Sequence, residues 1–193
     1  MAGAERGAKL EGVRSRKEQN AMNTSKHLLL AYATKHGSTQ EVAESIAETL
    51  ASGHEVDVRP AADVRDLDGY DGVILGGALY MGRWHGDAIG FLERHRHALA
   101  TIPVAIFAMG PKTLADADVA GARVQLDRAL AKAPEVSPAA VAIFGGVVDP
   151  STLRFPLSRM QASDARDWQA IAAWANEVAA ALLRSRINHA AAT

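Results

Sequence analysis

Short hydrophobic segments alternate with amphipathic segments along the chain after residue 26. Most of the hydrophobic segments carry almost no charge, which is typical of strands that are covered on both faces of a sheet. The amphipathic segments repeat an apolar residue every three or four positions, as helices do when one face packs on a core. This pattern predicts five strands, at residues 27–34, 54–59, 70–79, 102–109 and 139–148.

Four predicted helices connect or follow these strands. Their apolar stripes lie at residues 42–50, 88–99, 119–130 and 168–182. The regular alternation of strand and helix predicts an α/β fold, in which a parallel sheet is covered by helices on both faces. The longest irregular stretch is the predicted loop 149–163, and loops of that length are often functional.

Composition narrows the class of protein. The 193 residues are 48% hydrophobic and contain no cysteine, which excludes disulfides, cysteine-ligated zinc, iron–sulfur clusters and thiol nucleophiles. A net charge of -1 gives no general attraction to nucleic acid. The hydrophobic segments are too short to span a membrane. We therefore expect a cytoplasmic protein with no nucleic-acid partner and at most peripheral contact with a membrane.

Charge is unevenly distributed between the start of the sequence and the remainder. Residues 1–26 hold six basic and three acidic side chains, which leaves 15 basic against 19 acidic side chains, a net charge of -4, for the rest. Because residues 1–25 also contain almost no large apolar side chains, they are expected to form a disordered basic extension. The predicted domain spans residues 26–186, and residues 187–193 are expected to form a flexible tail.

The turn after the first predicted strand has the composition of an anion-binding site. Thr34, Ser38 and Thr39 bring hydroxyl groups to the start of the next predicted helix, and Gly37 frees backbone N–H groups there. A helix N-terminus of this kind attracts a phosphate. The alternative is an ordinary turn in which Ser38 or Thr39 only caps the helix. Lys35 adds a positive charge, either as a phosphate contact or as a solvated side chain.

Two further segments meet this turn at the carboxyl ends of the predicted strands. Residues 76–85 combine small residues with two of the ten aromatic side chains, Tyr80 and Trp84. Small residues let a ligand approach the backbone, and the two aromatic rings favour stacking on a planar ring over packing in the core. Residues 108–111 end the fourth predicted strand with the same small and turn-forming character. His85 is expected either at the start of a helix or in contact with a substrate.

Other phosphate-binding folds fit the sequence poorly. The turn TKHGST has one glycine where a dinucleotide-binding turn has G-x-G-x-x-G, and the G-x-x-x-x-G-K-[ST] motif is absent. A receiver domain needs an acidic cluster at the strand ends, where this chain has Ala33-Thr34 and Gly76-Gly77. No metal site is expected, because His95 and His97 are two positions apart on a predicted helix and point away from each other.

Three sequence blocks resemble the flavodoxin-like family. They are YATKHGSTQEVAESIA, YDGVILGGALYMGRWH and RDWQAIAAWANEVA, and they lie within residues 27–184. Within that family the chain is most similar to menaquinone-dependent protoporphyrinogen oxidases and related flavodoxin-domain proteins. The resemblance implies a flavodoxin-like three-layer sandwich, with a five-stranded parallel sheet in the order 2-1-3-4-5, and flavin mononucleotide (FMN) as the cofactor.

The resemblance also implies which residues bind this cofactor. The phosphate loop consists of Thr34, Lys35, His36, Gly37, Ser38 and Thr39. One side of the flavin ring is lined by Gly77, Ala78, Leu79, Tyr80, Met81, Gly82 and Trp84. The other side is lined by Ala108, Met109 and Gly110. Because the flavin itself carries the redox chemistry, no catalytic side chain is expected.

Two classes of function follow from the resemblance. One is an FMN-dependent oxidoreductase that passes electrons from a reduced organic substrate to a quinone, with protoporphyrinogen IX as the implied donor, within heme biosynthesis. The other is a carrier that moves electrons between redox partner proteins. Carrier flavodoxins are strongly acidic as a family, so the charge of -4 outside residues 1–26 favours the enzyme. Residues 149–163, with Phe155 and Met160, form either one wall of a substrate site or a plain connection.

Overall fold

Five parallel strands form the central sheet of the computed structural model, which describes residues 25–152 and 155–190. The strands are β1 (His27–Ala33), β2 (Glu55–Pro60), β3 (Gly72–Tyr80), β5 (Val104–Met109) and β6 (Ala140–Phe144). Their spatial order, β2-β1-β3-β5-β6, confirms the predicted order 2-1-3-4-5. A short strand, β4 (Arg83–Trp84), pairs antiparallel with the end of β3.

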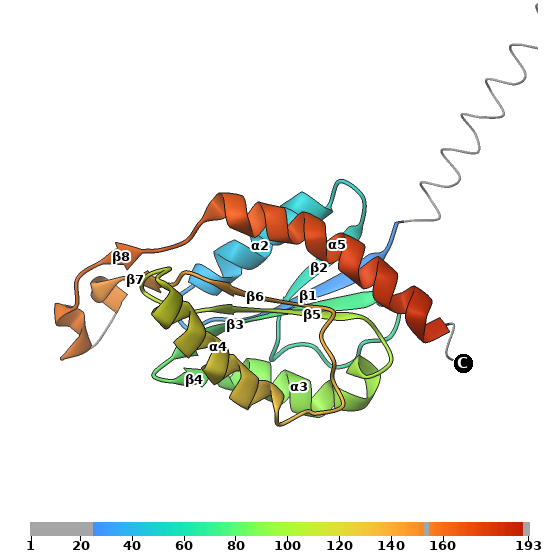
Figure 1. The fold of residues 1–193 in the computed structure, drawn as a ribbon, viewed down its shortest axis with the longest axis horizontal. Helices are drawn as coiled ribbons and strands as arrows, with labels where there is room; N and C mark the ends of the chain where they lie inside the picture. The colour runs from blue at the N-terminus through green and yellow to red at the C-terminus, as the bar shows by residue number, and fades with distance from the viewer. Residues whose placement is uncertain (1–24, 153–154, 191–193) are drawn as a thin grey trace, which may run out of the picture.

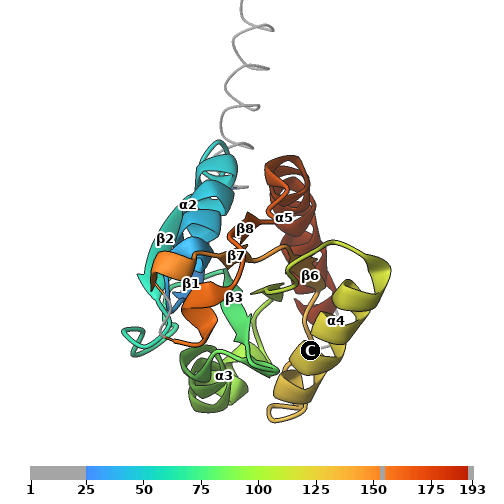
Figure 2. The ribbon, with the colours of Figure 1, turned by 90° about the vertical axis from the view of Figure 1, so that its left-hand side faces the viewer.

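Helices cover both faces of this sheet. On one face lie α2 (Ser38–Leu50) and α5 (Trp168–Ala190), and on the other lie α3 (Gly86–Leu99) and α4 (Asp116–Leu130) (Figures 1 and 2). The predicted three-layer α/β sandwich is therefore confirmed.

The alternating side chains of the strands explain why their sequences are hydrophobic without interruption. In β1, Leu28 and Leu30 belong to the core under α2 and α5, whereas Leu29 and Ala31 belong to the core under α3 and α4. Because both faces of β1 are covered, both sets of side chains have to be apolar. The edge strand β2 is only partly buried, which accounts for its alternation of apolar and polar residues.

The predicted fifth strand, at residues 139–148, is divided in the structure. The strand β6 ends at Phe144, and β7 (Val147–Val148) pairs antiparallel with β8 (Ser163–Asp164) in a separate two-stranded sheet. The break falls at Gly145, where an added Cβ atom would overlap the backbone carbonyl of Ala165. The expectation of one continuous strand is thus corrected, because the segment that leads into α5 passes too close for the strand to continue.

The predicted loop 149–163 contains short helical turns. The structure places 3-10 turns at η1 (Pro150–Thr152) and η2 (Leu157–Arg159), followed by β8. Together with β7 and β8 they lie at the end of the molecule where the strands of the central sheet finish (Figure 1). This segment therefore borders the end of the sheet at which α/β folds bind ligands.

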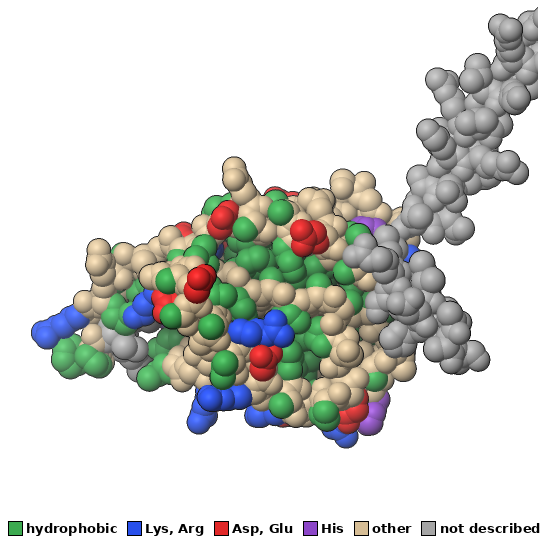
Figure 3. Space-filling model, in the orientation of Figure 1, with side chains coloured by type: hydrophobic (Ala, Val, Ile, Leu, Met, Phe, Trp, Pro, Cys, Tyr) green, Lys and Arg blue, Asp and Glu red, His purple; other side chains and the backbone are tan. Residues whose placement is uncertain are grey.

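The ends of the folded elements differ from the predicted domain limits. The helix α5 continues to Ala190, so residues 187–190 are helical and not part of a tail. Of the predicted extension 1–25, all but Ser25 lies outside the described residues, as do residues 191–193. No helix in the described ranges is long and apolar enough to cross a membrane. On the face shown in Figure 3, acidic and basic side chains are interspersed.

His95 is a polar residue in the core under α3. Its side chain is 9% exposed, and its ring lies 4.7 Å from the ring of Phe91. Its Nε2 atom has no hydrogen-bond partner within the described part of the chain. Burial lowers the pKa of His95, and the charge of Arg94 adds to this effect. A hydrogen bond with the Val64 backbone and the charge of Asp66 act in the opposite direction on the same pKa without reversing it.

Acidification should therefore destabilise the fold. Because the pKa of His95 is lower in the folded chain than its ordinary value of 6.5, the unfolded chain binds more protons once the pH falls below that value. The contribution of neutral His95 to the unfolding free energy is present in full above pH 6.5, and it is lost as the pH falls through the pKa of His95 in the folded chain. We expect His95→Leu to lose less unfolding free energy than wild type between about pH 7.5 and about pH 5.5 in urea titrations.

The control for this variant is His97→Leu, at an exposed position of the same helix, which should keep the wild-type dependence on pH. The unfolding free energy of His95→Leu should still depend on pH to some extent, because burial also lowers the pKa of His54. A His95→Leu protein with the full wild-type slope would show that His95 is not the group responsible.

Candidate functional site

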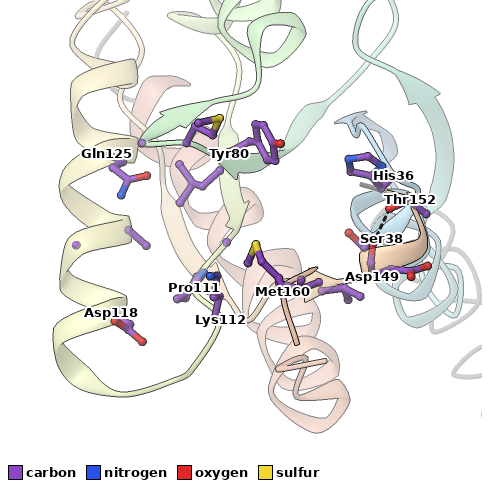
Figure 4. A pocket seen from close by; sticks show the side chains of 18 of the residues that line it. His36, Ser38, Tyr80, Pro111, Lys112, Asp118, Gln125, Asp149, Thr152 and Met160 are labelled. Atoms are coloured by element: carbon purple, nitrogen blue, oxygen red, sulfur yellow. Dashed lines mark hydrogen bonds between the residues drawn. The ribbon is translucent and has the colours of Figure 1, made fainter. Parts of the chain in front are cut away.

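A cavity of about 560 Å³ lies at the end of the central sheet where the parallel strands finish. Ligand pockets usually measure about 300–1,000 Å³. The cavity is lined by the turns after β1, β3 and β5, by α4, and by residues between 147 and 160 (Figure 4). The chain leaves β1 toward one face of the sheet and β3 toward the other, and ligands bind at such a switch point in α/β folds.

The helix α2 begins at a glycine in the left-handed conformation. Gly37 occupies the N-cap position with φ of 90°, and its N–H group donates a hydrogen bond to Thr34 Oγ1 at 3.0 Å. No side chain caps the helix, so the alternative in which Ser38 or Thr39 acts as the cap is not what the structure shows. The backbone N–H groups of the first turn therefore have no acceptor within the helix.

Thr39 has a buried hydroxyl group in this first turn. The residue is fully buried, and its Oγ1 atom has no hydrogen-bond partner in the described ranges. A buried hydroxyl without a partner costs about 1–3 kcal/mol, so such groups are rare unless a ligand completes them. The free N–H groups of this turn give the start of α2 donors that suit an anion, whereas Thr39 itself does not line the cavity.

A cation–π contact joins this turn to the end of β3. Lys35 Nζ lies 4.5 Å from the centroid of the Tyr80 ring, and Tyr80 lines the cavity. The ammonium group therefore lies over the aromatic ring. The sequence analysis, which considered a phosphate contact or a solvated side chain for Lys35, did not predict this contact. The contact brings a positive charge to the cavity wall.

The wall next to Tyr80 is a tight turn between β3 and β4. Met81 and Gly82 both have positive φ, 49° and 79°, and both line the cavity. The left-handed conformation is uncommon for a residue such as Met81, whose side chain is 79% exposed. The turn therefore presents a large apolar side chain and a bare backbone to the cavity.

The opposite wall depends on the close approach of glycine backbones. A Cβ atom added to Gly110 would lie 2.6 Å from Leu79 Cβ, and one added to Gly146 would lie 3.0 Å from the Gly110 carbonyl oxygen. Hydrogen bonds from Gly110 N–H to Phe144 O and from Gly146 N–H to Pro111 O hold these segments together. Gly110 thus lines the cavity beside the end of β3.

The structure corrects the predicted role of Trp84. Its side chain is 2% exposed, belongs to the core under α3, and donates a hydrogen bond from Nε1 to the carbonyl of Gly77 at 2.9 Å. The indole does not line the cavity. Gly77 is small because the indole fills the place of its side chain, not because a ligand approaches it. The neighbouring His85 caps α3 by accepting a hydrogen bond from Asp87 N–H.

The remaining predicted residues fall into two groups. Those that line the cavity are His36, Ser38, Leu79, Tyr80, Met81, Gly82 and Gly110. Thr34, Lys35, Gly37 and Thr39 lie in the same turn as His36 and Ser38, whereas Ala108 and Met109 are buried in β5, and Ala78 is partly buried in β3. The sheet residues support the wall from behind.

Several lining residues were not predicted as cofactor-binding residues, although some lie in the segments 108–111 and 149–163 that the sequence analysis singled out. They are Pro111, Lys112, Ala117, Asp118, Gly121, Ala122, Gln125, Val147, Val148, Asp149, Thr152 and Met160. For α4, nothing in its periodicity separates the side that faces the cavity from an ordinary exposed face. Asp149 lies at the start of the long predicted loop, and that loop was the feature of the sequence that could have identified it. Hydrogen bonds from Ser151 lower the pKa of its carboxyl group.

Arg166 connects the segment before α5 to the first turn of α2. Its guanidinium group donates hydrogen bonds to Asp164, at 2.6 Å, and to Glu41, and it lies 4.7 Å from the ring centroid of Trp168. Its hydrogen bond lowers the pKa of Asp164. Because Glu41 is paired with a cation, it repels an anion at the start of α2 less strongly than a free carboxylate would.

Comparison with known proteins identifies the family of this fold and site. A family model for the flavodoxin domain matches residues 29–160. The chain belongs to the flavodoxin domain family. No match is found among curated proteins. A flavodoxin domain binds FMN for electron transfer, so the family confirms the cofactor that the resemblance implied.

Solved structures share the flavodoxin fold at low sequence identity. A short-chain flavodoxin associated with a non-canonical PDU bacterial microcompartment is 15% identical, with a TM-score of 0.53 over 83% of this chain and 99% of that one. The apo form of the NADH:FMN oxidoreductase EMOB is also 15% identical, with a TM-score of 0.53 over 82% and 90% of the two chains.

Rubredoxin oxygen:oxidoreductase from Desulfovibrio gigas is 12% identical, with a TM-score of 0.56 over 89% of this chain and 39% of that one. At these identities the solved structures establish the fold alone. The comparisons give no support to the closer resemblance to protoporphyrinogen oxidases.

The position of Trp84 in this flavodoxin domain can be tested directly. Trp84→Phe removes the hydrogen bond to a buried carbonyl and shrinks a core side chain, so we expect it to lower the unfolding free energy by about 2 kcal/mol. FMN affinity should stay within about twofold of wild type, because the indole does not face the cavity. Denaturant titration and flavin fluorescence measure the two quantities.

Trp168→Phe, at a position that is 44% exposed, is the control and should change the stability less. A stable Trp84→Phe protein that lost its affinity for FMN would show that Trp84 contacts the cofactor after all.

Proposed function

We propose that this flavodoxin domain is an FMN-dependent oxidoreductase that passes electrons from a reduced organic substrate through FMN to a quinone. The observation that carries the proposal is the extent of the cavity. It begins at the start of α2, at His36 and Ser38, and continues past the β3–β4 turn as far as α4 (Figure 4). A site for a phosphate alone needs only the first part of this length.

The start of α2 suits the phosphate group of FMN. In this proposal the N–H groups of the first turn and the hydroxyl groups of Ser38 and Thr39 donate hydrogen bonds to the phosphate oxygens. The hydrogen bond from Gly37 to Thr34 fixes the turn that presents these donors. His36 lines the same end of the cavity.

The turns after β3 and β5 suit the flavin ring. Tyr80, Met81 and Gly82 stand on one side of the cavity and Gly110 on the other, and both walls offer apolar surface and bare backbone. The bound flavin supplies the redox chemistry, and the protein has to hold it and limit its contact with water. In the proposed reaction the donor loses two electrons and two protons, and the quinone gains two of each to become a hydroquinone.

A carrier function is the second candidate, and one observation favours it. Met81 lines the cavity and is 79% exposed, so a partner protein could reach the cavity through an apolar contact. Against it stands the charge, because the net charge of -4 outside residues 1–26 is small for a protein that docks on a basic partner. A carrier that docks on a basic partner needs a surface of one sign.

The narrower proposal of protoporphyrinogen IX as the donor rests on the three sequence blocks alone. Anaerobic addition of protoporphyrinogen IX to the oxidised, FMN-loaded protein tests it. Bleaching of the flavin absorption band would support this donor, and an unchanged band over many minutes would remove it while leaving the general proposal intact.

Thr39→Val tests the phosphate site. Valine has nearly the shape of threonine, and removing an unpartnered hydroxyl should leave the stability unchanged or raise it by about 1 kcal/mol. The affinity for FMN should fall at least about tenfold, because a hydrogen bond to a charged phosphate is lost. Fluorescence titration of the apoprotein with FMN measures this affinity.

Thr49→Val on the same helix is the matched control, since Thr49 Oγ1 donates to the Ser45 carbonyl and lies away from the first turn. It should bind FMN as wild type does. Wild-type affinity in Thr39→Val would show that the phosphate lies elsewhere.

The choice between enzyme and carrier is decided by the electron acceptor. The FMN-loaded protein is reduced with dithionite and mixed with either menadione, a small quinone, or cytochrome c, a protein acceptor, in a stopped-flow instrument. Faster reoxidation by menadione is expected for the enzyme, and reoxidation by cytochrome c alone would indicate the carrier. A protein that retains no FMN would overturn both.

A further inference from the structure

The cavity has two ends of different chemistry. At one end His36, Ser38, Asp149 and Thr152 surround the start of α2 (Figure 4). At the other end α4 forms the wall, with Ala117, Asp118, Gly121, Ala122 and Gln125. Tyr80 and Lys112 stand between the two ends (Figure 4). The proposed phosphate site accounts for the first end and leaves the α4 end without an assigned ligand.

The wall that α4 forms consists mostly of residues with small side chains, so the cavity reaches close to the helix backbone. Ala117, Gly121 and Gln125 follow one another at intervals of one helical turn, and Ala122 lies beside them. A Cβ atom added to Gly121 would meet nothing within 4 Å. The cavity therefore has free space directly in front of the helix backbone at this position.

Two side chains at this end offer hydrogen-bond donors that the chain itself does not use. The amide of Gln125 is partly buried and makes no hydrogen bond to any described residue. Lys112, across the cavity from α4, is exposed and forms no ion pair within the described part (Figure 4). Asp118 differs from these two, because its carboxylate already accepts a hydrogen bond from the Thr113 hydroxyl.

These observations define the kind of molecule that fits. Ala122 and Met160 provide apolar surface, and Gln125 and Lys112 provide donors on opposite sides. A flat apolar ring that carries oxygen acceptors at its edge would satisfy both. Carbonyl oxygens, as in a quinone, and carboxylate oxygens, as in an aromatic acid, share this chemistry.

We propose that the α4 end of the cavity is the binding site for the organic electron-transfer substrate, a flat ring with acceptor oxygens that receive hydrogen bonds from Gln125 and Lys112. This inference rests on the proposed function, because it assigns the rest of the cavity to FMN. Gly121 then determines specificity, since its missing side chain leaves room for the ring.

The test measures binding to the oxidised, FMN-loaded protein and needs no turnover. Isothermal titration with menadione and with naphthoate covers the two sources of acceptor oxygens. We expect at least one of the two probes to bind, and Lys112→Gln to weaken naphthoate more than menadione, because only the former is charged. Failure of both probes to bind to a protein that holds FMN would overturn this inference and leave the proposed function standing.

Gly121→Leu places a side chain in the proposed ring site. Leucine is a better helix former than glycine, so α4 should remain folded. We expect this variant to bind the probe at least tenfold more weakly while its FMN affinity stays within about twofold of wild type. Ala120→Leu is the matched control, because Ala120 is an exposed neighbour that does not line the cavity, and it should bind both ligands as wild type does.

Gln125→Leu tests the proposed hydrogen bond from the Gln125 amide to the ring, separately from the free space in front of Gly121. Loss of one neutral donor should weaken the probe about fivefold without changing FMN affinity. If Gly121→Leu instead lowers FMN affinity as much as probe affinity, the α4 end belongs to the flavin site and the inference is wrong. If the wild-type protein binds no FMN at all, the proposed function has failed first.

Discussion

The burial of a parallel sheet on both faces is the constraint on which the rest of this structure depends. Each strand in the interior of the sheet has to be covered twice, so successive helices are divided between the two faces, with α2 and α5 on one and α3 and α4 on the other. The connections after β1 and β3 therefore diverge and leave a gap at the carboxyl ends of the strands. The cavity of this flavodoxin domain lies in that gap, and some of its polar groups, among them His36 and Ser38, come from the turns that the divergence exposes.

Close backbone contacts give the cavity its shape. Gly110 lies against Leu79, Gly146 against the Gly110 carbonyl, and Gly145 against Ala165, so the ends of β3, β5 and β6 are packed without intervening side chains. This packing also divides the last predicted strand and sends residues 147–164 out as the hairpin of β7 and β8. Arg166 then joins the hairpin to the first turn of α2 through Asp164 and Glu41. The cavity wall and the start of α2 are consequently held in one arrangement.

The electrostatics of the cavity follow from side chains on different elements. Lys35 on the turn after β1 reaches the Tyr80 ring at the end of β3, while Lys112 comes from the turn after β5. Asp149 and Asp118 bring negative charge, each held by a neighbouring hydroxyl group, from Ser151 and Thr113. Charges of both signs thus surround a partly apolar space.

The amino-acid sequence by itself determined the strands, the helices and the turn at the start of α2. These depend on local properties, the periodicity of apolar residues and the conformational freedom of Gly37, which a short stretch of chain expresses without knowledge of its neighbours. The tertiary structure decided what lies across the cavity. It buried Trp84 against Gly77, where composition suggested a stacking surface, because the space left by that glycine lies in the core. It also brought the small residues of α4 to the cavity, and it divided the last strand at Gly145. Such contacts join residues far apart in the chain, and no local pattern encodes which partner each side chain will meet.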